Sequence, residues 1–413
     1  MSMRKVILSS ATLAIALWLA PGAGAADPIK IGIVGPNTGP AATTGLTVTA
    51  TWKLVADEYN GKGGIAIDGE QRLIELLPAD SQSKPSTGVS AAQRLLTRDQ
   101  VDILVGDTLH SDVTLAIMEL ATAFPDTLFY APLPVSSTIS DKIRDEPEKY
   151  GNVWKWDADT EAYATSIADF MTSDAAAESR HFENKTYAIV AEQTNYSSTI
   201  AESVKEALAG TGWELLTSEG APVGSTDYYS QITKIKSLDP DVVISIMTAA
   251  NSGLAYIKQS REQAVEYEDI GVYYPGLPPF MKGVGSDGNG LIFFTGTFDT
   301  KSERGREFAD LMVANDIPPS GDAVLGYCSA TVMFDAVARA GSLDAAKIGD
   351  ALLETDDDTC ANYQRIVFDP KRHSPLLGPD HAFMPGAQLY ADGKEFFIFY
   401  PERAATGKLD ELP

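Results

Sequence analysis

The sequence is poor in the residue types that build metal and redox sites. Cys328 and Cys360 are the two cysteines among 413 residues, and four histidines are scattered along the chain. The two cysteines lie too far apart for the C-x-x-C pattern of a redox centre, and the histidines lack the spacing of metal ligands. The sequence therefore predicts no metal site and no redox cofactor.

Positive charge is also scarce. The chain has 32 Lys and Arg against 57 Asp and Glu, which gives a formal net charge of −25 at pH 7. A nucleic-acid-binding surface needs a basic stripe that releases counterions, and a surface that docks on anionic lipid needs a basic cluster. Neither is present in the sequence, so we expect no nucleic-acid partner and no lipid-surface partner.

Long apolar runs are confined to the N-terminus. Arg4 and Lys5 precede an apolar run over residues 6–20, and Ala23-Gly24-Ala25 follows with the small-x-small pattern of a cleavage site. This arrangement is typical of a secretory signal peptide, which predicts that residues 1–25 are removed and that the mature chain is exported. Because no cysteine lies near the cut, we expect no lipid anchor.

Export bears on the two cysteines, because disulfides form and persist in oxidising compartments. An even count in an exported chain predicts a Cys328–Cys360 disulfide.

Three common motifs are missing. Gly32, Gly35 and Gly39 lie in the first predicted strand and in the loop after it, but they do not fit G-x-G-x-x-G, and no G-K-[ST] follows them. The G-x-S-x-G pattern of an α/β-hydrolase is absent as well. The sequence therefore predicts neither a nucleotide cofactor nor a hydrolase, and we expect a protein that is not an enzyme.

The stretch over residues 29–64 organises the rest. Alternating β-branched residues predict a strand over 29–34, a Gly- and Pro-rich loop follows over 35–45, and apolar residues then recur at helical spacing up to Tyr59. Strand, polar loop and helix form the first half of a βαβ unit. In open α/β sheets, ligands bind in loops at the carboxyl ends of such strands.

The alternation of strand and helix continues through the chain in two halves. Predicted strands over residues 72–77, 101–105 and 128–130 are separated by helical patterns, and a second series begins at residue 185. Residues 131–140 and 145–150 are predicted to be turns. This order favours the α/β class with parallel sheets.

The runs KIGIVGPNTGPAATTG and LVADEYNGKGGI, together with RIVFDP and FFIFYP near the end, resemble the periplasmic leucine/isoleucine/valine-binding protein family. The resemblance implies two Rossmann-like lobes joined by a three-crossover hinge. Lobe 1 is expected over residues 26–153 and 276–359, and lobe 2 over 154–275 and 360–413. It also implies a periplasmic, monomeric transport receptor that binds a small molecule between the lobes and delivers it to a membrane ABC permease.

The resemblance places a carboxylate-binding loop at residues 106–112. A polar loop at a helix start presents free backbone N–H groups that hold a carboxylate without a cation. The family serine aligns with either His110 or Ser111. The full set of expected ligand-contacting residues is Thr44, Thr108, His110, Ser111, Ser136, Ser137, Trp156, Tyr196, Tyr274 and Leu277.

One feature departs from amino-acid-binding relatives. The loop GVYYPGLPPF, residues 271–280, lacks the acid that pairs with a ligand ammonium. Asp157, Asp159 or Glu192 could replace it; otherwise the ligand is an uncharged amide or an anion such as an aromatic or keto acid. A sensory receptor that presents its ligand to a membrane kinase is the alternative function.

Overall fold

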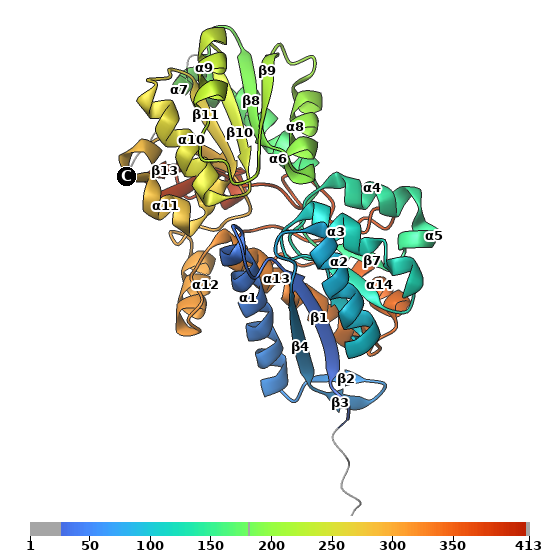
Figure 1. Cartoon of the computed structure of the whole chain (residues 1–413). Coiled ribbons are helices and arrows are strands. Elements are labelled where there is room, and N and C mark those ends of the chain that lie inside the picture. The colour runs from blue at the N-terminus through green and yellow to red at the C-terminus, as the bar shows by residue number, and fades with distance from the viewer. Residues whose placement is uncertain (1–25, 181, 410–413) are drawn as a thin grey trace, which may run out of the picture.

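The computed structural model describes residues 26–180 and 182–409. The predicted signal peptide, residues 1–25, lies outside the described residues. Within them, no helix combines the length and the apolar character needed to cross a membrane. Figure 1 shows two lobes of similar construction, one below and one above a narrow junction, each with a central sheet flanked by helices.

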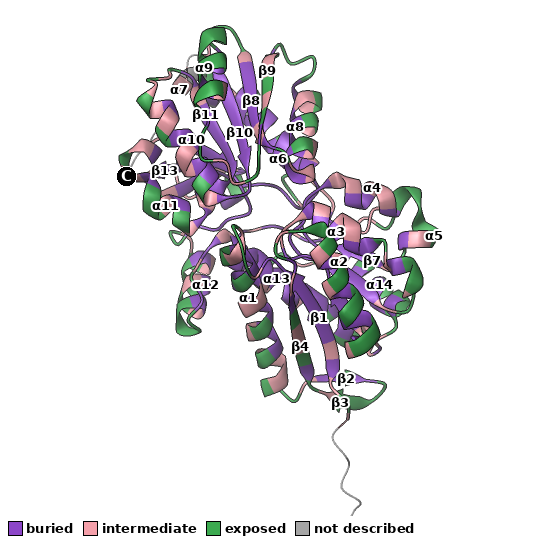
Figure 2. Cartoon of the chain, viewed as in Figure 1, coloured by how far each residue is buried: buried purple, intermediate pink, exposed green. Residues whose placement is uncertain are grey.

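The sheet of lobe 1 has five parallel strands in the order β4-β1-β5-β6-β7. Its central strands consist almost entirely of buried apolar residues, as a sheet covered by helices on both faces requires (Figure 2). The strands are β1 (Ile29–Gly35), β4 (Ile74–Asp80), β5 (Ile103–Val105), β6 (Leu128–Ala131) and β7 (Val153–Lys155), with a separate hairpin of β2 (Ile65–Ile67) and β3 (Glu70–Arg72).

Helices from two distant parts of the chain cover this sheet. The core beside β1 contains Trp52, which packs edge-on against Phe334 with ring centroids 5.6 Å apart. The helices are α1 (Ala42–Gly61), α2 (Pro85–Arg94), α3 (Ser111–Met118), α4 (Ser137–Asp145), α5 (Pro147–Tyr150), α12 (Glu303–Ala314), α13 (Gly321–Ala340) and α14 (Ala345–Leu353). A π-turn, Leu95–Asp99, continues α2.

The sheet of lobe 2 has seven strands in the order β14-β13-β12-β11-β10-β8-β9, in which β13 runs antiparallel to both of its neighbours, β12 and β14. The strands are β8 (Thr186–Glu192), β9 (Glu214–Ala221), β10 (Val242–Met247), β11 (Glu268–Tyr273), β12 (Ile292–Phe294), β13 (Gly386–Tyr390) and β14 (Glu395–Tyr400). The helices are α6 (Thr160–Thr172), α7 (Asp174–Arg180), α8 (Asn195–Leu208), α9 (Tyr229–Leu238), α10 (Ala250–Glu262) and α11 (Pro278–Val284).

The α/β class and the three crossings agree with the sequence analysis, but the lobe boundaries differ. The core of lobe 1 holds residues up to Trp156 and from Phe298 to Phe368. The core of lobe 2 holds Ala158 to Phe294, and again residues from Ala382 onward. The return at residue 276 is therefore placed too early, because β12 pairs with β11 and extends the second sheet.

Two further expectations for local structure do not hold. Residues expected to be turns form α4 and α5. The start of α4 is fixed by Ser136, whose Oγ accepts a hydrogen bond from the backbone N–H of Thr138 at 3.3 Å. Residues 360–368, expected in lobe 2, pack with lobe 1, because Cys360 is bonded to α13 and Phe368 packs on Trp154.

A buried ion network joins the first and third crossings. The Lys155 Nζ lies 2.9 Å from Asp159 Oδ1, and both side chains are fully buried. The other oxygen of Asp159 accepts hydrogen bonds from Arg372 Nη2 at 2.9 Å and from Ser374 Oγ at 3.0 Å. Burial opposes the ionisation of Asp159, but Lys155 and Arg372 outweigh it and hold the pKa of that carboxyl below its usual value.

Aromatic stacking supports the same junction. The ring of His373 stacks on Trp154 with centroids 4.0 Å apart and planes 6° from parallel. The backbone N–H of Lys155 donates to the carbonyl of His373 at 2.9 Å. The first and third crossings therefore form one packed unit, and bending between the lobes has to occur around it.

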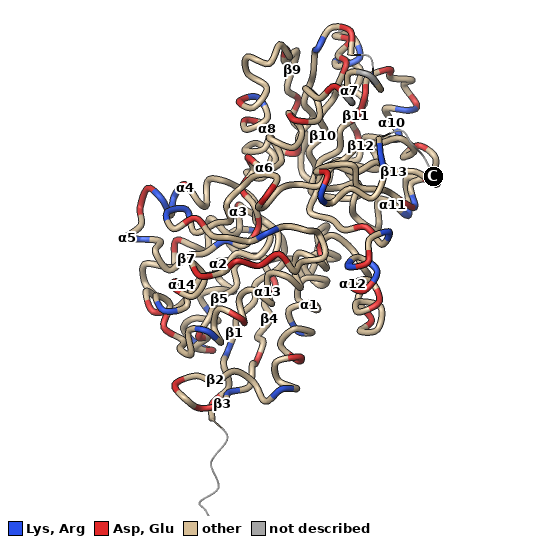
Figure 3. The backbone as a smooth tube through the Cα atoms, turned by 180° about the vertical axis from the view of Figure 1, so that it is seen from behind, with Lys and Arg blue, Asp and Glu red and all other residues tan. Residues whose placement is uncertain are grey.

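Charged side chains show no segregation by lobe. In Figure 3, basic residues lie among acidic ones over both lobes of the described chain. Many of them form exposed local pairs, such as Lys142 with Glu119 and Arg144 with Asp141. Such exposed pairs contribute little to stability, so the acidity of the chain acts on its solubility rather than on its fold.

The predicted disulfide is present: Cys328 in α13 is bonded to Cys360. Titration of the unfolded, unreduced protein should find no free thiol. Because the bond closes a loop of 32 residues, the C328S/C360S double variant should lose about 3–4 kcal/mol of unfolding free energy in the chain-entropy view. Two free thiols in the wild-type protein, or a double variant of unchanged stability, would contradict this assignment.

The ion network predicts a large cost for removing its lysine. Lys155→Met leaves Asp159 buried with less compensation and should lower the unfolding free energy by about 3–5 kcal/mol in a urea titration. The matched control is Lys53→Met, which removes an exposed pair with Asp57 and should cost about 0.5 kcal/mol or less. Equal costs for the two variants would show that the buried network does not stabilise the junction.

Candidate ligand-binding site

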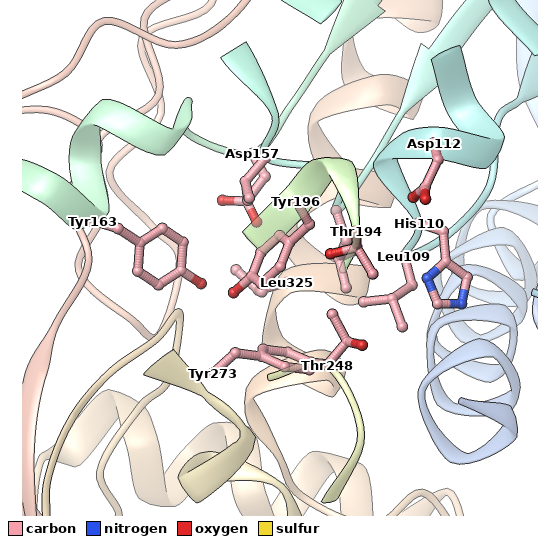
Figure 4. A pocket seen from close by; sticks show the side chains of 12 residues that line it. Leu109, His110, Asp112, Asp157, Tyr163, Thr194, Tyr196, Thr248, Tyr273 and Leu325 are labelled. Carbon is pink, nitrogen blue, oxygen red and sulfur yellow. The ribbon is translucent and has the colours of Figure 1, made fainter. Parts of the chain in front are cut away.

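A small cavity lies between the two lobes. Its walls come from loops that follow β5, β6, β8 and β10, from the crossing after β7, from the end of β11, and from α3, α6, α8 and α13. Carboxyl ends of parallel strands from both lobes therefore meet there, which is the usual position of ligands in open α/β sheets. The lining residues, most of them labelled in Figure 4, are Leu109, His110, Asp112, Leu133, Val135, Asp157, Tyr163, Thr194, Tyr196, Thr248, Tyr273 and Leu325.

The loop after β5 is fixed by a buried carboxylate. Asp107 Oδ1 accepts hydrogen bonds from the backbone N–H groups of Leu109 at 3.0 Å and His110 at 2.6 Å. Its Oδ2 accepts from Ser81 Oγ at 2.5 Å. Burial raises the pKa of Asp107, although these bonds and His110 counteract that effect. The result is a rigid loop that places Leu109 and His110 in the cavity wall just before α3 begins.

Three tyrosines form the opposite wall. The rings of Tyr163 and Tyr196 lie edge to face with centroids 6.3 Å apart, and Tyr196 meets Tyr273 in the same way at 6.3 Å. The Tyr196 hydroxyl is buried and interacts with the hydroxyl of Tyr163. The Nε2 atom of His110 is buried and makes no hydrogen bond in the described structure. A buried polar atom of this kind favours a ligand that supplies the missing partner.

Asp157 is the fully desolvated acid of the cavity. Its Oδ1 accepts a hydrogen bond from the backbone N–H of Ala158 at 2.8 Å. Burial raises the pKa of Asp157 to about 7, against a lowering effect of Lys155. The Lys155 ammonium is bonded to Asp159 and to the backbone oxygens of Asp157 and Ala158, at 2.7 Å and 2.9 Å for the latter two. It therefore donates to the Asp157 backbone rather than to the carboxylate.

The other two acids considered as ammonium partners have structural roles. Asp159 belongs to the crossing network. Glu192 accepts hydrogen bonds from Gly224 N at 2.9 Å, from Thr248 N at 2.7 Å and from Ser252 Oγ at 2.7 Å. Those bonds tie together the loops of lobe 2. Of the three, Asp157 is the one that lines the cavity.

The ten residues expected to contact ligand are distributed unevenly. His110 and Tyr196 line the cavity. Thr108, Ser111 and Ser136 are buried beside it, and Ser111 Oγ accepts from the Ser136 N–H at 3.3 Å. Ser137 does not line the cavity; its Oγ lies 2.8 Å from Thr160 Oγ1.

The remaining four lie outside the lining. Trp156 is fully buried in the core of lobe 1, and Leu277 belongs to the core of lobe 2. Tyr274 points into lobe 2, where its hydroxyl lies 2.8 Å from Ser245 Oγ; its neighbour Tyr273 faces the cavity instead. Thr44 is hydrogen-bonded to Tyr273 and Asp322 without lining the cavity.

Several lining residues were not identified from the sequence. Thr194 and Thr248 directly follow strands, so the rule of carboxyl-end loops was sufficient to find them. Tyr163 and Leu325 lie on helices, where an aromatic or apolar residue reads as core. These two side chains line the cavity because the two lobes meet there, and the sequence does not show how the lobes are arranged.

The comparisons with known proteins fit this geometry. A family model described as periplasmic binding protein matches residues 28–381. The chain belongs to this family. The Leu/Ile/Val-binding protein BraC3 of Rhizobium johnstonii is 29% identical over 341 residues, covering 82% of this chain and 86% of that protein.

Solved structures show the same fold at low sequence identity. The substrate-binding protein LivJ of Streptococcus pneumoniae, in complex with isoleucine, superposes with a TM-score of 0.72 at 20% identity over 89% of this chain and 97% of its own. A solute-binding protein of an ABC transporter from R. palustris, in complex with benzoate, gives a TM-score of 0.75 at 17% identity over 92% and 100%.

Asp157 should destabilise the ligand-free protein at neutral pH. Its pKa is 3.8 as an ordinary carboxyl and about 7 in the fold, so ionisation favours unfolding, and stability falls as pH rises between those values. Asp157→Asn should therefore raise Tm at pH 8, by roughly 2–4 °C per kcal/mol relieved, and have little effect at pH 4. A variant that is less stable than wild type at pH 8 would contradict this.

Proposed function

We propose that this protein is the substrate-binding component of an ABC transporter and that it captures a zwitterionic amino acid with an apolar or aromatic side chain. Membership of the periplasmic binding protein family and similarity to BraC3 support the general role. The observation that carries the ligand class is Asp157, a desolvated acid in the cavity wall with no cationic partner for its carboxylate there.

The charge of the cavity favours a ligand with an amino group. Among its described lining residues, Asp157 and Asp112 are acidic and none is Lys or Arg. A buried carboxylate without a counter-ion is costly, and a ligand ammonium would compensate it. A purely anionic ligand such as an aromatic acid would meet no cation. Asp157 thus takes the role of the acid that the 271–280 loop lacks.

The remaining groups match the other parts of an amino acid. The N–H groups in the first turn of α3 have no partner within the helix, and His110, whose Nε2 makes no hydrogen bond in the described structure, directly precedes that helix. We assign the ligand carboxylate to this corner. Leu109, Leu133, Val135 and Leu325, with the three tyrosines, would enclose an apolar or aromatic side chain.

This function places the protein outside the cytoplasm and gives it a membrane partner. Residues 1–25 would direct export, and the ligand-bound protein would dock, as a monomer, on permease subunits of the transporter. Closure of the lobes around the ligand provides the shape that a permease distinguishes, since hinge closure converts occupancy into a change of form.

The test is calorimetric titration of refolded residues 26–413 with a panel of leucine, phenylalanine, short amides, benzoate and 3,4-dihydroxybenzoate. We expect an amino acid to bind. Asp157→Asn should weaken that binding by about tenfold to a hundredfold, because a hydrogen bond to a charged group is lost. The matched control Asp112→Asn removes the same charge from a partly exposed lining residue and should have a smaller effect.

The pH dependence identifies the group involved. Below about 7 a proton competes with the ligand ammonium for Asp157, so Kd should rise by about tenfold per pH unit as pH falls. The Asp157→Asn variant retains His110 and should lose this dependence. Binding of benzoate but of no amino acid, strengthened by Asp157→Asn, would overturn the ligand class while leaving the general role intact.

A further inference from the structure

Tyr273 belongs to both the cavity wall and the contact between lobes. It is the last residue of β11 and pairs in register with Met247 of β10, so its backbone is part of lobe 2. Its ring lines the cavity beside Tyr196. Figure 4 shows the ring of Tyr273 at the lower edge of the cavity, with Leu325 of lobe 1 and Thr248 of lobe 2 nearby.

The hydroxyl of Tyr273 reaches across to lobe 1. It donates a hydrogen bond to Asp322 Oδ1 at 3.0 Å, in the first turn of α13. Thr44 of α1 donates to Asp322 Oδ2 at 2.6 Å, and its Oγ1 lies 3.0 Å from the Tyr273 hydroxyl. All three side chains are buried. We refer to Tyr273, Asp322 and Thr44 as the interlobe triad.

The backbone of Tyr273 is strained. Its φ of 71° and ψ of −63° lie in a region that residues with a Cβ rarely adopt. Such a conformation persists only where the surrounding structure holds it in place, and it tends to occur at ligand clamps and switches. Here the ring is held by the cavity wall and the hydroxyl by Asp322. Opening the lobes would remove the second of these restraints.

We propose that Tyr273 is a positioning residue that makes lobe closure depend on a filled cavity. The proposal rests on the proposed function, because it takes the cavity as the ligand site. A ligand that packs on the ring keeps the hydroxyl in line with Asp322 and so favours the closed form. A ligand that is too large displaces the ring, breaks the triad and leaves the lobes apart. Tyr273 therefore limits ligand size as well.

The matched comparison is between Tyr273→Phe and Tyr256→Phe. Tyr256 is also fully buried, and its hydroxyl donates to Asp269 Oδ1 at 2.9 Å, but both residues lie in lobe 2. Both variants remove a buried tyrosine–aspartate hydrogen bond, so both should lower Tm. Only Tyr273→Phe removes a bond between lobes.

The experiment measures the distance between lobes by single-molecule energy transfer. Dyes are attached to cysteines introduced at Val313 in lobe 1 and Leu238 in lobe 2, which are 64% and 40% exposed. Tyr273→Phe should move the ligand-free distribution towards longer distances and raise the ligand dissociation rate by about tenfold or more. Tyr256→Phe should change neither. Adding Tyr273→Phe to Asp322→Ala should have no further effect, since the two share one interaction.

Two failures remain distinguishable. If wild type binds no panel member, the proposed function fails, but the ligand-free distance distributions still test the triad. If Tyr273→Phe matches Tyr256→Phe in the distance distribution and in dissociation rate, or if its effects add to those of Asp322→Ala, the proposed role of Tyr273 is overturned.

Discussion

The junction between the lobes depends on the buried ion pair of Lys155 and Asp159, extended by Arg372. A charged pair taken out of water is tolerated only where each group finds close partners, and here the partners come from both the first and the third crossing. That requirement fixes the two crossings against each other. Asp157, which lines the cavity, lies between Lys155 and Asp159 in the chain, so the network on either side of it fixes its position.

The two acids in this short segment show how environment separates structural from ligand-binding roles. Asp159 has a lysine, an arginine and two serines around it, and its pKa is lowered. The side chain of Asp157 accepts one backbone hydrogen bond, from Ala158, and burial raises its pKa. Two identical side chains, two residues apart, therefore differ in their partners: Asp159 is paired with cations, whereas Asp157 lines the cavity and accepts one backbone hydrogen bond.

The sequence was sufficient for the fold class and the disulfide, because strand and helix periodicity and an even cysteine count are local or simple signals. It was less informative about the lobe boundaries. The sequence of β12 predicts a strand, but it does not show which of the two sheets that strand joins. For the candidate site, two of the residues expected from the sequence, His110 and Tyr196, line the cavity. Of the adjacent Tyr273 and Tyr274, the sequence analysis named Tyr274, whereas it is Tyr273 that lines the cavity, because the backbone at Tyr273 has an unusual conformation that periodicity does not reveal.

The packing of Trp52 against Phe334 has a consequence for how the chain matures. The core of lobe 1 cannot be completed until α13, late in the sequence, has been synthesised. Contacts between such distant segments slow folding. For a chain predicted to leave the cytoplasm, slow completion of this core would be an advantage, because the early segments would remain unfolded until the whole polypeptide has been exported. The native core would then form in the compartment where the Cys328–Cys360 bond can also be made.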